Sequence, residues 1–189
     1  MLSPEEWQIV ALSLRVSLLA VAGTLPIAFG LAWLLARGRF AGKILLDAAV
    51  HLPLVLPPVV IGWLLLIGFG RSGPIGGFLY ETFGITLIFR WTGAALASAV
   101  MALPLMIRAI RLSIEAIDRR LEGAARTLGA TPWHAFWTVS LPLCLPGVLA
   151  AVVLGFARSI GEFGATITFV SNIPGETQTL PIAVYAALQ

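Results

Sequence analysis

Four long stretches of this chain contain no charged residue, and they restrict its possible folds more than any other feature of its 189 residues. An α-helix rises about 1.5 Å per residue, so about 20 apolar residues cross the roughly 30 Å hydrocarbon core of a membrane. Two of the stretches have 21 and 23 residues, and the other two have 17 each. We therefore expect an all-α integral membrane protein. The expected spans are residues 16–36, 48–70, 91–107 and 141–157.

Composition excludes several other classes of protein. The chain is 59% hydrophobic and 11% charged, whereas soluble domains have about 25% charged residues. A net charge of +3 over so apolar a sequence does not indicate a nucleic-acid partner. One cysteine and two histidines cannot form an internal disulfide or the usual zinc and iron–sulfur ligand sets. We expect no metal and no cofactor.

The positions of the basic residues predict the orientation of the spans. Residues 37–43 and 108–126 together hold eight of the twelve lysines and arginines. Short cytoplasmic loops collect such residues. Because two expected spans separate these loops, both would lie on the same side of the membrane. We expect both to be cytoplasmic and the N-terminus to lie outside.

Three prolines interrupt the second expected span, which predicts a bend there. Pro53, Pro57 and Pro58 cannot donate a backbone hydrogen bond. The carbonyls that they leave without a partner are tolerated in a membrane only where they face protein or a wet cavity. These prolines are therefore candidates either for the lining of a translocation pathway or for a kink that serves only packing.

Arg158 and Glu162 follow the fourth expected span. They would lie on one face of a helix, if the helix continues, and neutralise each other. Charged residues at membrane depth usually have a function, which makes this pair a second pathway candidate. The alternative is a pair at the outer headgroup level that only anchors the helix.

The remaining apolar stretches, residues 163–175 and 180–189, are too short to cross alone as helices. We expect a re-entrant or interfacial segment there, and a sequence that ends before a last span.

The segment after residue 117 has the signals of a short amphipathic helix. Asp118 is a good N-cap and Gly129 a good C-cap. Four apolar residues between them share one face by their spacing. This face could lie against the protein's own bundle or in the groove of a partner. The four residues are Leu121, Ala124, Ala125 and Leu128.

This segment, EGAARTLGATPWHAFWTVSLP, resembles the EAA loop of ABC-importer permeases, whose pattern is E-A-A-x3-G-x9-I-x-L-P. Two positions depart from the pattern. Gly123 stands where the glutamate belongs, with Glu122 one residue earlier, and Val139 replaces isoleucine. We expect Glu122 to substitute in part for the missing carboxylate. The matching residues are Ala124, Ala125, Gly129, Leu141 and Pro142.

Two further segments resemble the molybdate branch of these permeases, with sulfate, thiosulfate and tungstate permeases as close relatives. They are HLPLVLPPVVIGWLLL in the second span and ARSIGEFGATITFVSNIPGETQTLPIAVY near the end. The resemblance implies one permease domain over residues 1–189, a helix bundle of the importer type in the cytoplasmic membrane. Residues 108–142 would form its cytoplasmic coupling loop, and the family normally continues through one more span.

The resemblance also implies partners. They are a second copy of the chain, two ATP-binding subunits, a periplasmic or surface-tethered oxyanion-binding protein, and membrane lipid. The sequence holds no G-x4-G-K-[ST] motif, so we expect a transport subunit whose ATPase is a separate protein. The residues expected to contact that ATPase are Leu121, Glu122, Gly123, Ala124, Ala125, Arg126, Leu128 and Gly129.

Two other functions compete with an oxyanion importer. The proline-broken span and the charged pair would also suit an ion-coupled secondary transporter, although that function does not explain the cytoplasmic helix. A membrane enzyme is disfavoured, since no span holds a nucleophile–base pair or a metal-ligand set.

Overall fold

The computed structural model describes residues 3–189, so Met1 and Leu2 of the expected domain lie outside it. Residues 3–189 form ten α-helices and one π-helical turn and contain no strand, which confirms the all-α expectation. The elements are α1 (Pro4–Arg37), α2 (Lys43–Val55), α3 (Pro58–Phe69), α4 (Pro74–Phe83), α5 (Trp91–Glu115), α6 (Arg119–Thr127), α7 (Pro132–Ala135), η1 (Phe136–Ser140), α8 (Leu141–Ile160), α9 (Gly164–Val170) and α10 (Leu180–Ala187).

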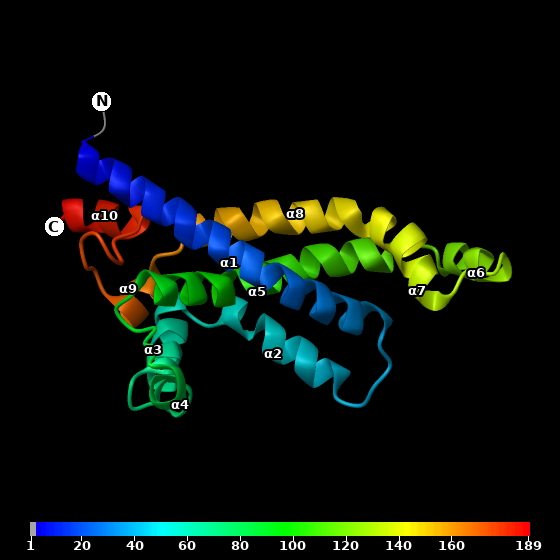
Figure 1. Ribbon diagram of the computed structural model, residues 1–189, viewed down its shortest axis with the longest axis horizontal. Coiled ribbons are helices and arrows are strands. Elements are labelled where there is room, and N and C mark those ends of the chain that lie inside the picture. Colours follow the sequence, from blue (N-terminus) through cyan, green and yellow to red (C-terminus); the bar gives the residue numbers. More distant parts are fainter. Residues whose placement is uncertain (1–2) are drawn as a thin grey trace.

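Helices α1, α5 and α8 run side by side and form the body of the protein (Figure 1). Their shared core combines large side chains such as Met106 and Ile110 with alanines such as Ala28 and Ala151, all fully buried. Small residues let helix backbones approach closely inside a membrane, where packing rather than the hydrophobic effect holds helices together. A Cβ at Gly147 would lie 2.2 Å from the Ser113 Cβ, so α8 meets α5 at a glycine.

Three of the four expected spans are continuous helices long and apolar enough to cross a membrane, and each is longer than expected. Helix α1 begins at Pro4 because Ser3 and Glu6 form a capping box. Helix α5 continues past Ile107 to Glu115. The fourth expected span begins at Pro132, since the chain passes from α7 through the π-helical turn η1 into α8 with no break. The non-helical part of the loop is correspondingly shorter than residues 108–142.

The second expected span is not one crossing helix. Its residues lie in α2 and α3, whose axes differ by 114°. The break is at Leu56 and Pro57, which are extended, and Pro58 is the first residue of α3. A residue before proline avoids the helical region, so the Pro57–Pro58 pair turns the chain. Pro53 lies inside α2, so the predicted bend occurs at the second and third prolines only.

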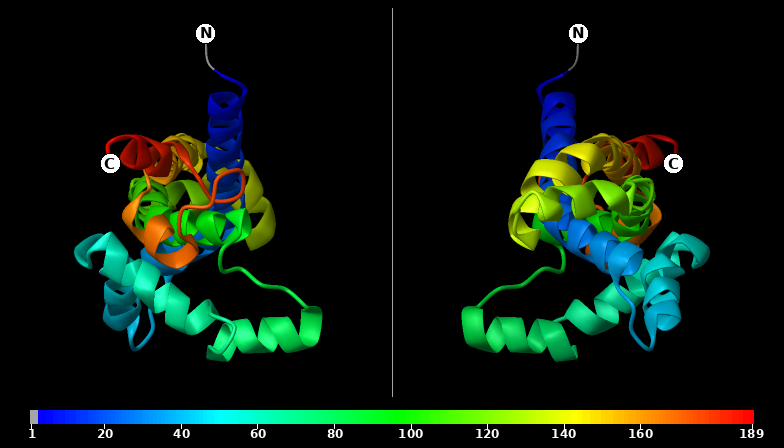
Figure 2. Two further views of the ribbon diagram at one scale, coloured as in Figure 1. Left: turned by 90° about the vertical axis from the view of Figure 1, so that its left-hand side faces the viewer. Right: turned by 90° about the vertical axis from the view of Figure 1, so that its right-hand side faces the viewer.

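Loop 38–42 and α6 lie at one end of the body, whereas α4, α9 and α10 lie at the other (Figure 1). The two arginine-rich loops are therefore on the same side, as the count of spans predicted. At the opposite end, the Arg15 guanidinium lies 3.9 Å from the centre of the Trp91 ring. Helices α2, α3 and α4 form an arm on one side of the bundle (Figure 2).

The C-terminal helices α9 and α10 have seven and eight residues, so neither crosses a membrane alone, as predicted. Helix α9 packs on α3 and α5 and buries Phe169 and Val170. Helix α10 is held to α1 where the Leu180 N–H donates to Ser13 Oγ at 2.7 Å.

Candidate functional site

Helix α6 has the two ends that its sequence predicted. The Asp118 carboxylate accepts a hydrogen bond from the Arg120 N–H at 2.9 Å. Gly129 has a φ of +91°, a conformation that favours glycine and reverses the chain just past the helix. The Thr131 hydroxyl then accepts from the His134 N–H at 3.2 Å and starts α7. Local signals therefore hold α6 at a defined position between two membrane helices.

The apolar face of α6 does not pack against the protein's own bundle. Helix α6 lies wholly within the described residues and has no buried side chain. Leu121 is 48% exposed and Leu128 is 89% exposed. A shallow hollow of about 360 Å³ lies beside them, with Ala125 and Gly129 in its lining. Of the two interpretations of this face, packing on the body of the same chain is wrong.

Glu122 is the one coupling candidate whose charge turns inward. Its Oε1 accepts from Arg37 Nη2 at 2.7 Å and from Ser140 Oγ at 2.8 Å. The carboxylate thus joins α6 to the last residue of α1 and to η1, so it is already engaged within the chain. At Gly123, where the EAA pattern has its glutamate, a Cβ would have no atom of residues 3–189 within 4 Å apart from its chain neighbours and the nearby backbone of its own helix. The expectation that Glu122 replaces the missing carboxylate is therefore not supported by its direction.

Arg37 and Ser140 were missed as partners in the sequence analysis. Arg37 stands 85 positions before Glu122, and only its place at the end of the first span pointed to the same side of the membrane.

Arg158 and Glu162 form the ion pair that their spacing predicted, with Arg158 Nη1 2.5 Å from Glu162 Oε2. The helix does not continue through the pair: α8 ends at Ile160, and Glu162 lies in the turn before α9. The Glu162 Oε1 accepts from the Ala165 N–H at 2.7 Å. Its side chain is only 1% exposed, which does not fit an anchor at the headgroup level. The pair joins α8 to α9.

The structure brings only one of the pathway prolines to this pair. A Cβ at Gly164, two residues after Glu162, would lie 2.9 Å from the Pro58 Cβ. Pro57 is exposed and Pro53 lies within α2. The bend between α2 and α3 and the joint between α8 and α9 are therefore neighbours, and a pathway role for these residues stays a prediction.

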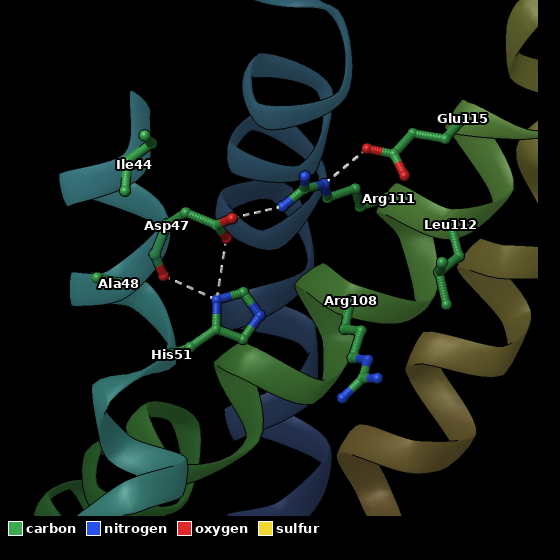
Figure 3. Close-up of a pocket in the computed structure, with 8 residues that line it drawn as sticks. All are labelled: Ile44, Asp47, Ala48, His51, Arg108, Arg111, Leu112 and Glu115. Carbon is green, nitrogen blue, oxygen red and sulfur yellow. Dashed lines mark hydrogen bonds and ion pairs between the residues drawn. The ribbon is translucent and has the colours of Figure 1, made fainter. Parts of the chain in front are cut away.

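A second charged group lies between α2 and α5, near the end that carries α6 (Figure 3). Arg111 Nη1 lies 2.9 Å from Asp47 Oδ2, and Arg111 Nε lies 2.8 Å from Glu115 Oε1. His51 contacts Asp47 through Nδ1. The residue types of this group gave no motif, because they come from two helices 64 positions apart.

Comparison with known proteins agrees with this arrangement. The sequence profile of a family described as the binding-protein-dependent transport system inner membrane component matches residues 25–187. The chain belongs to this family: it is an inner-membrane permease component of a binding-protein-dependent, ABC-type transport system. Membership implies ATP-binding and substrate-binding partners, and it contradicts the alternative of an ion-coupled secondary transporter.

Two relatives within this family are molybdenum transport permeases with high identity to the chain. The chain is 62% identical over 188 residues to the molybdenum transport system permease protein ModB of Escherichia coli (strain K12), covering 100% of this chain and 82% of that protein. It is 61% identical over 180 residues to ModB of Haemophilus influenzae, covering 95% and 79%.

The fold also has a solved counterpart. It matches a crystal structure of a bacterial ABC transporter involved in the import of the acidic polysaccharide alginate with a TM-score of 0.73. The match is 18% identical and covers 97% of this chain and 68% of that one.

Proposed function

We propose that this chain translocates molybdate across the cytoplasmic membrane as the permease subunit of an ATP-driven importer. Identity of 62% to a molybdenum transport permease over the whole chain supports the substrate. Tungstate, sulfate and thiosulfate are the alternatives, because they are tetrahedral dianions like molybdate. Substrate choice between them would rest largely on the oxyanion-binding protein that delivers the ion.

The working unit that we propose contains two copies of this chain in the lipid bilayer and two ATP-binding subunits on the cytoplasmic side. Hydrolysis takes place in those subunits, and this chain converts their movement into alternating access. The observation that carries this proposal is the outward apolar face of α6, with Leu128 89% exposed at the end of the body. An exposed apolar face on a short capped helix is suited to bind in a groove of a partner.

A movement of the ATP-binding subunits against α6 would be transmitted to the membrane helices through Glu122. Its carboxylate contacts the end of α1 through Arg37 and the start of the fourth expected span through Ser140. Because both contacts are hydrogen bonds to one ionised group, they keep α6 in a fixed relation to the two helices. Movement of the ATP-binding subunits would therefore shift α1 and α8 together.

The docking of α6 is tested by replacing Leu128 in the permease and measuring its association with the ATP-binding subunits. Leu128→Glu places a charge in the proposed apolar contact. We expect it to weaken association at least about tenfold, since a buried leucine contributes about 2 kcal/mol. Leu128→Met keeps the apolar contact and serves as the matched control. Equal association of the two variants would contradict the assignment of α6 as the coupling helix.

The substrate is tested by ATP-driven uptake into vesicles that contain the assembled importer and its binding protein. We expect labelled molybdate to accumulate, and excess tungstate to compete more strongly than excess sulfate. Uptake of sulfate in preference to molybdate would replace the proposed substrate, and uptake without ATP would overturn the proposed energy source.

A further inference from the structure

A cavity of about 570 Å³ lies between α2 and α5 at the end of the body that carries α6. Five titratable side chains line it, in a chain of which only 11% is charged. Ionisable groups on membrane helices are costly, and they commonly mark the site or path of a polar ligand. The five are Asp47, His51, Arg108, Arg111 and Glu115.

Contacts at 2.8 to 3.2 Å join four of these groups. Arg111 bridges the two carboxylates of Asp47 and Glu115, at 2.9 and 2.8 Å. The Nδ1 of His51 lies 2.8 Å from the Asp47 carbonyl oxygen, which can only accept, so this nitrogen carries the hydrogen. The other ring nitrogen, Nε2, is then an acceptor in the neutral ring, so it offers an anion no hydrogen-bond donor. The charge of Arg111 is already balanced by the carboxylates of Asp47 and Glu115.

Arg108 differs from these four groups in its lack of an ion pair with them. It is exposed to the cavity, and the ion pairs found among residues 3–189 do not include it. Figure 3 shows its guanidinium pointing away from the chain of contacts that joins Asp47, Arg111 and Glu115. Within the part of the chain that the structure describes, the cavity therefore contains a cation, Arg108, that has no ion-pair partner.

We propose that this cavity binds a tetrahedral oxyanion, held by the guanidinium of Arg108. A guanidinium presents paired N–H donors that match the oxygens of such an ion. The two nearby carboxylates repel an anion and keep the affinity low, which suits a site that must release its ligand. This inference rests on the proposed function only in identifying the transported ion as one ligand.

Two sources supply an anion with tetrahedral oxygens. The transported dianion has tetrahedral oxygens, and so has the phosphate of a phospholipid headgroup. Arg108 stands 17 residues after Trp91, or about 26 Å along a helix, so it lies near the edge of the hydrocarbon core. The experiment therefore has one arm for each source.

The first arm measures labelled molybdate by equilibrium dialysis. The protein is the permease with its ATP-binding subunits in phosphatidylcholine nanodiscs, without the binding protein. We expect Arg108→Gln to weaken binding at least about tenfold, since a hydrogen bond to a charged group is lost. Asp47→Asn should tighten it several-fold, because it removes a repelling charge and releases Arg111. Arg39→Gln, an exposed residue of loop 38–42 outside the cavity, removes the same charge as a control and should leave binding unchanged.

The second arm uses nanodiscs that contain phosphatidylglycerol and measures the retained lipid by mass spectrometry. Loss of retained phosphatidylglycerol in Arg108→Gln, with no molybdate bound by the wild type, identifies a lipid headgroup as the ligand and supports the site. If Arg108→Gln and Arg39→Gln match in both arms, there is no oxyanion site in this cavity. ATP-driven uptake by the wild type tests the proposed function separately, so either idea can fail while the other stands.

Discussion

Two glutamates at opposite ends of the body each join neighbouring helices, but they differ in burial and in how far away their partners lie in the sequence. Glu122, on α6, receives hydrogen bonds from Arg37 and Ser140, and its side chain is 27% exposed. Glu162, between α8 and α9, pairs with Arg158 and accepts from the Ala165 N–H, and its side chain is 1% exposed. All the partners of Glu162 lie within four residues of it, whereas one partner of Glu122 lies 85 residues away.

The difference separates a strong joint, the pair of Glu162 with Arg158, from a weaker link, the contacts of Glu122 with Arg37 and Ser140. A buried, locally paired carboxylate is expensive to disturb, because an uncompensated charge would remain inside the protein. The Arg37–Glu122 pair, with side chains 14% and 27% exposed, contributes less to stability, since water reaches both partners. The Glu162 joint therefore fixes the arrangement of α8, α9 and α3, while the Glu122 link holds α6 to α1 and η1 with a smaller contribution to stability.

The largest effect is expected from Glu162→Gln, which removes the buried charge opposite Arg158. We expect a loss of about 3 kcal/mol in the free energy of unfolding, the lower end for a broken buried pair, because Arg158 is partly exposed. Denaturant unfolding in detergent micelles measures it. Glu81→Gln, an exposed residue at the same end, is the matched control. Equal stability of the two variants would show that the pair of Glu162 with Arg158 stabilises the protein no more than an exposed charge does.

A smaller effect is expected from Gly62→Ala, which tests the packing around the same joint. The new Cβ would lie 2.6 Å from the Ala165 carbonyl oxygen and 2.8 Å from the Thr168 Cβ. Backbone cannot move aside easily, so we expect a loss of about 2 kcal/mol, measured in the same unfolding assay. In Gly23→Ala, the new Cβ would have no atom of residues 3–189 within 4 Å apart from its chain neighbours and the nearby backbone of its own helix. If the Gly62 variant unfolds like this control, α3 is not held tightly on α9.

The smallest effect is expected from Glu122→Gln, which weakens the contacts of Glu122 with Arg37 and Ser140. We expect about 1 kcal/mol at most, since the pair is partly exposed. Amide hydrogen exchange in α6 should become about fivefold faster, because the helix opens more often. Arg126→Gln, on the same helix and exposed, should not change this exchange. Unchanged exchange in Glu122→Gln would mean that the caps alone hold α6.

Much of the fold could be predicted because its causes are local. Long apolar stretches predicted the helices that cross, and Asp118, Gly129 and Thr131 predicted the ends of α6 and the start of α7. The pairing of Arg158 with Glu162 followed from a separation of four residues. The bend of 114° between α2 and α3 was predicted in kind but not in size, because the packing of α3 on α9 sets the direction of α3 after Pro58.

By itself, the sequence determined an all-α membrane protein, basic loops that share one end of it, and a capped helix between α5 and α8. Hydropathy and capping act between residues a few positions apart, so they can be read directly from the chain. Only the tertiary structure decided which way Glu122 points, that Leu128 stays exposed, and that Arg111 meets Asp47. Such contacts depend on how whole helices pack, and no local pattern encodes the side chains that packing brings together.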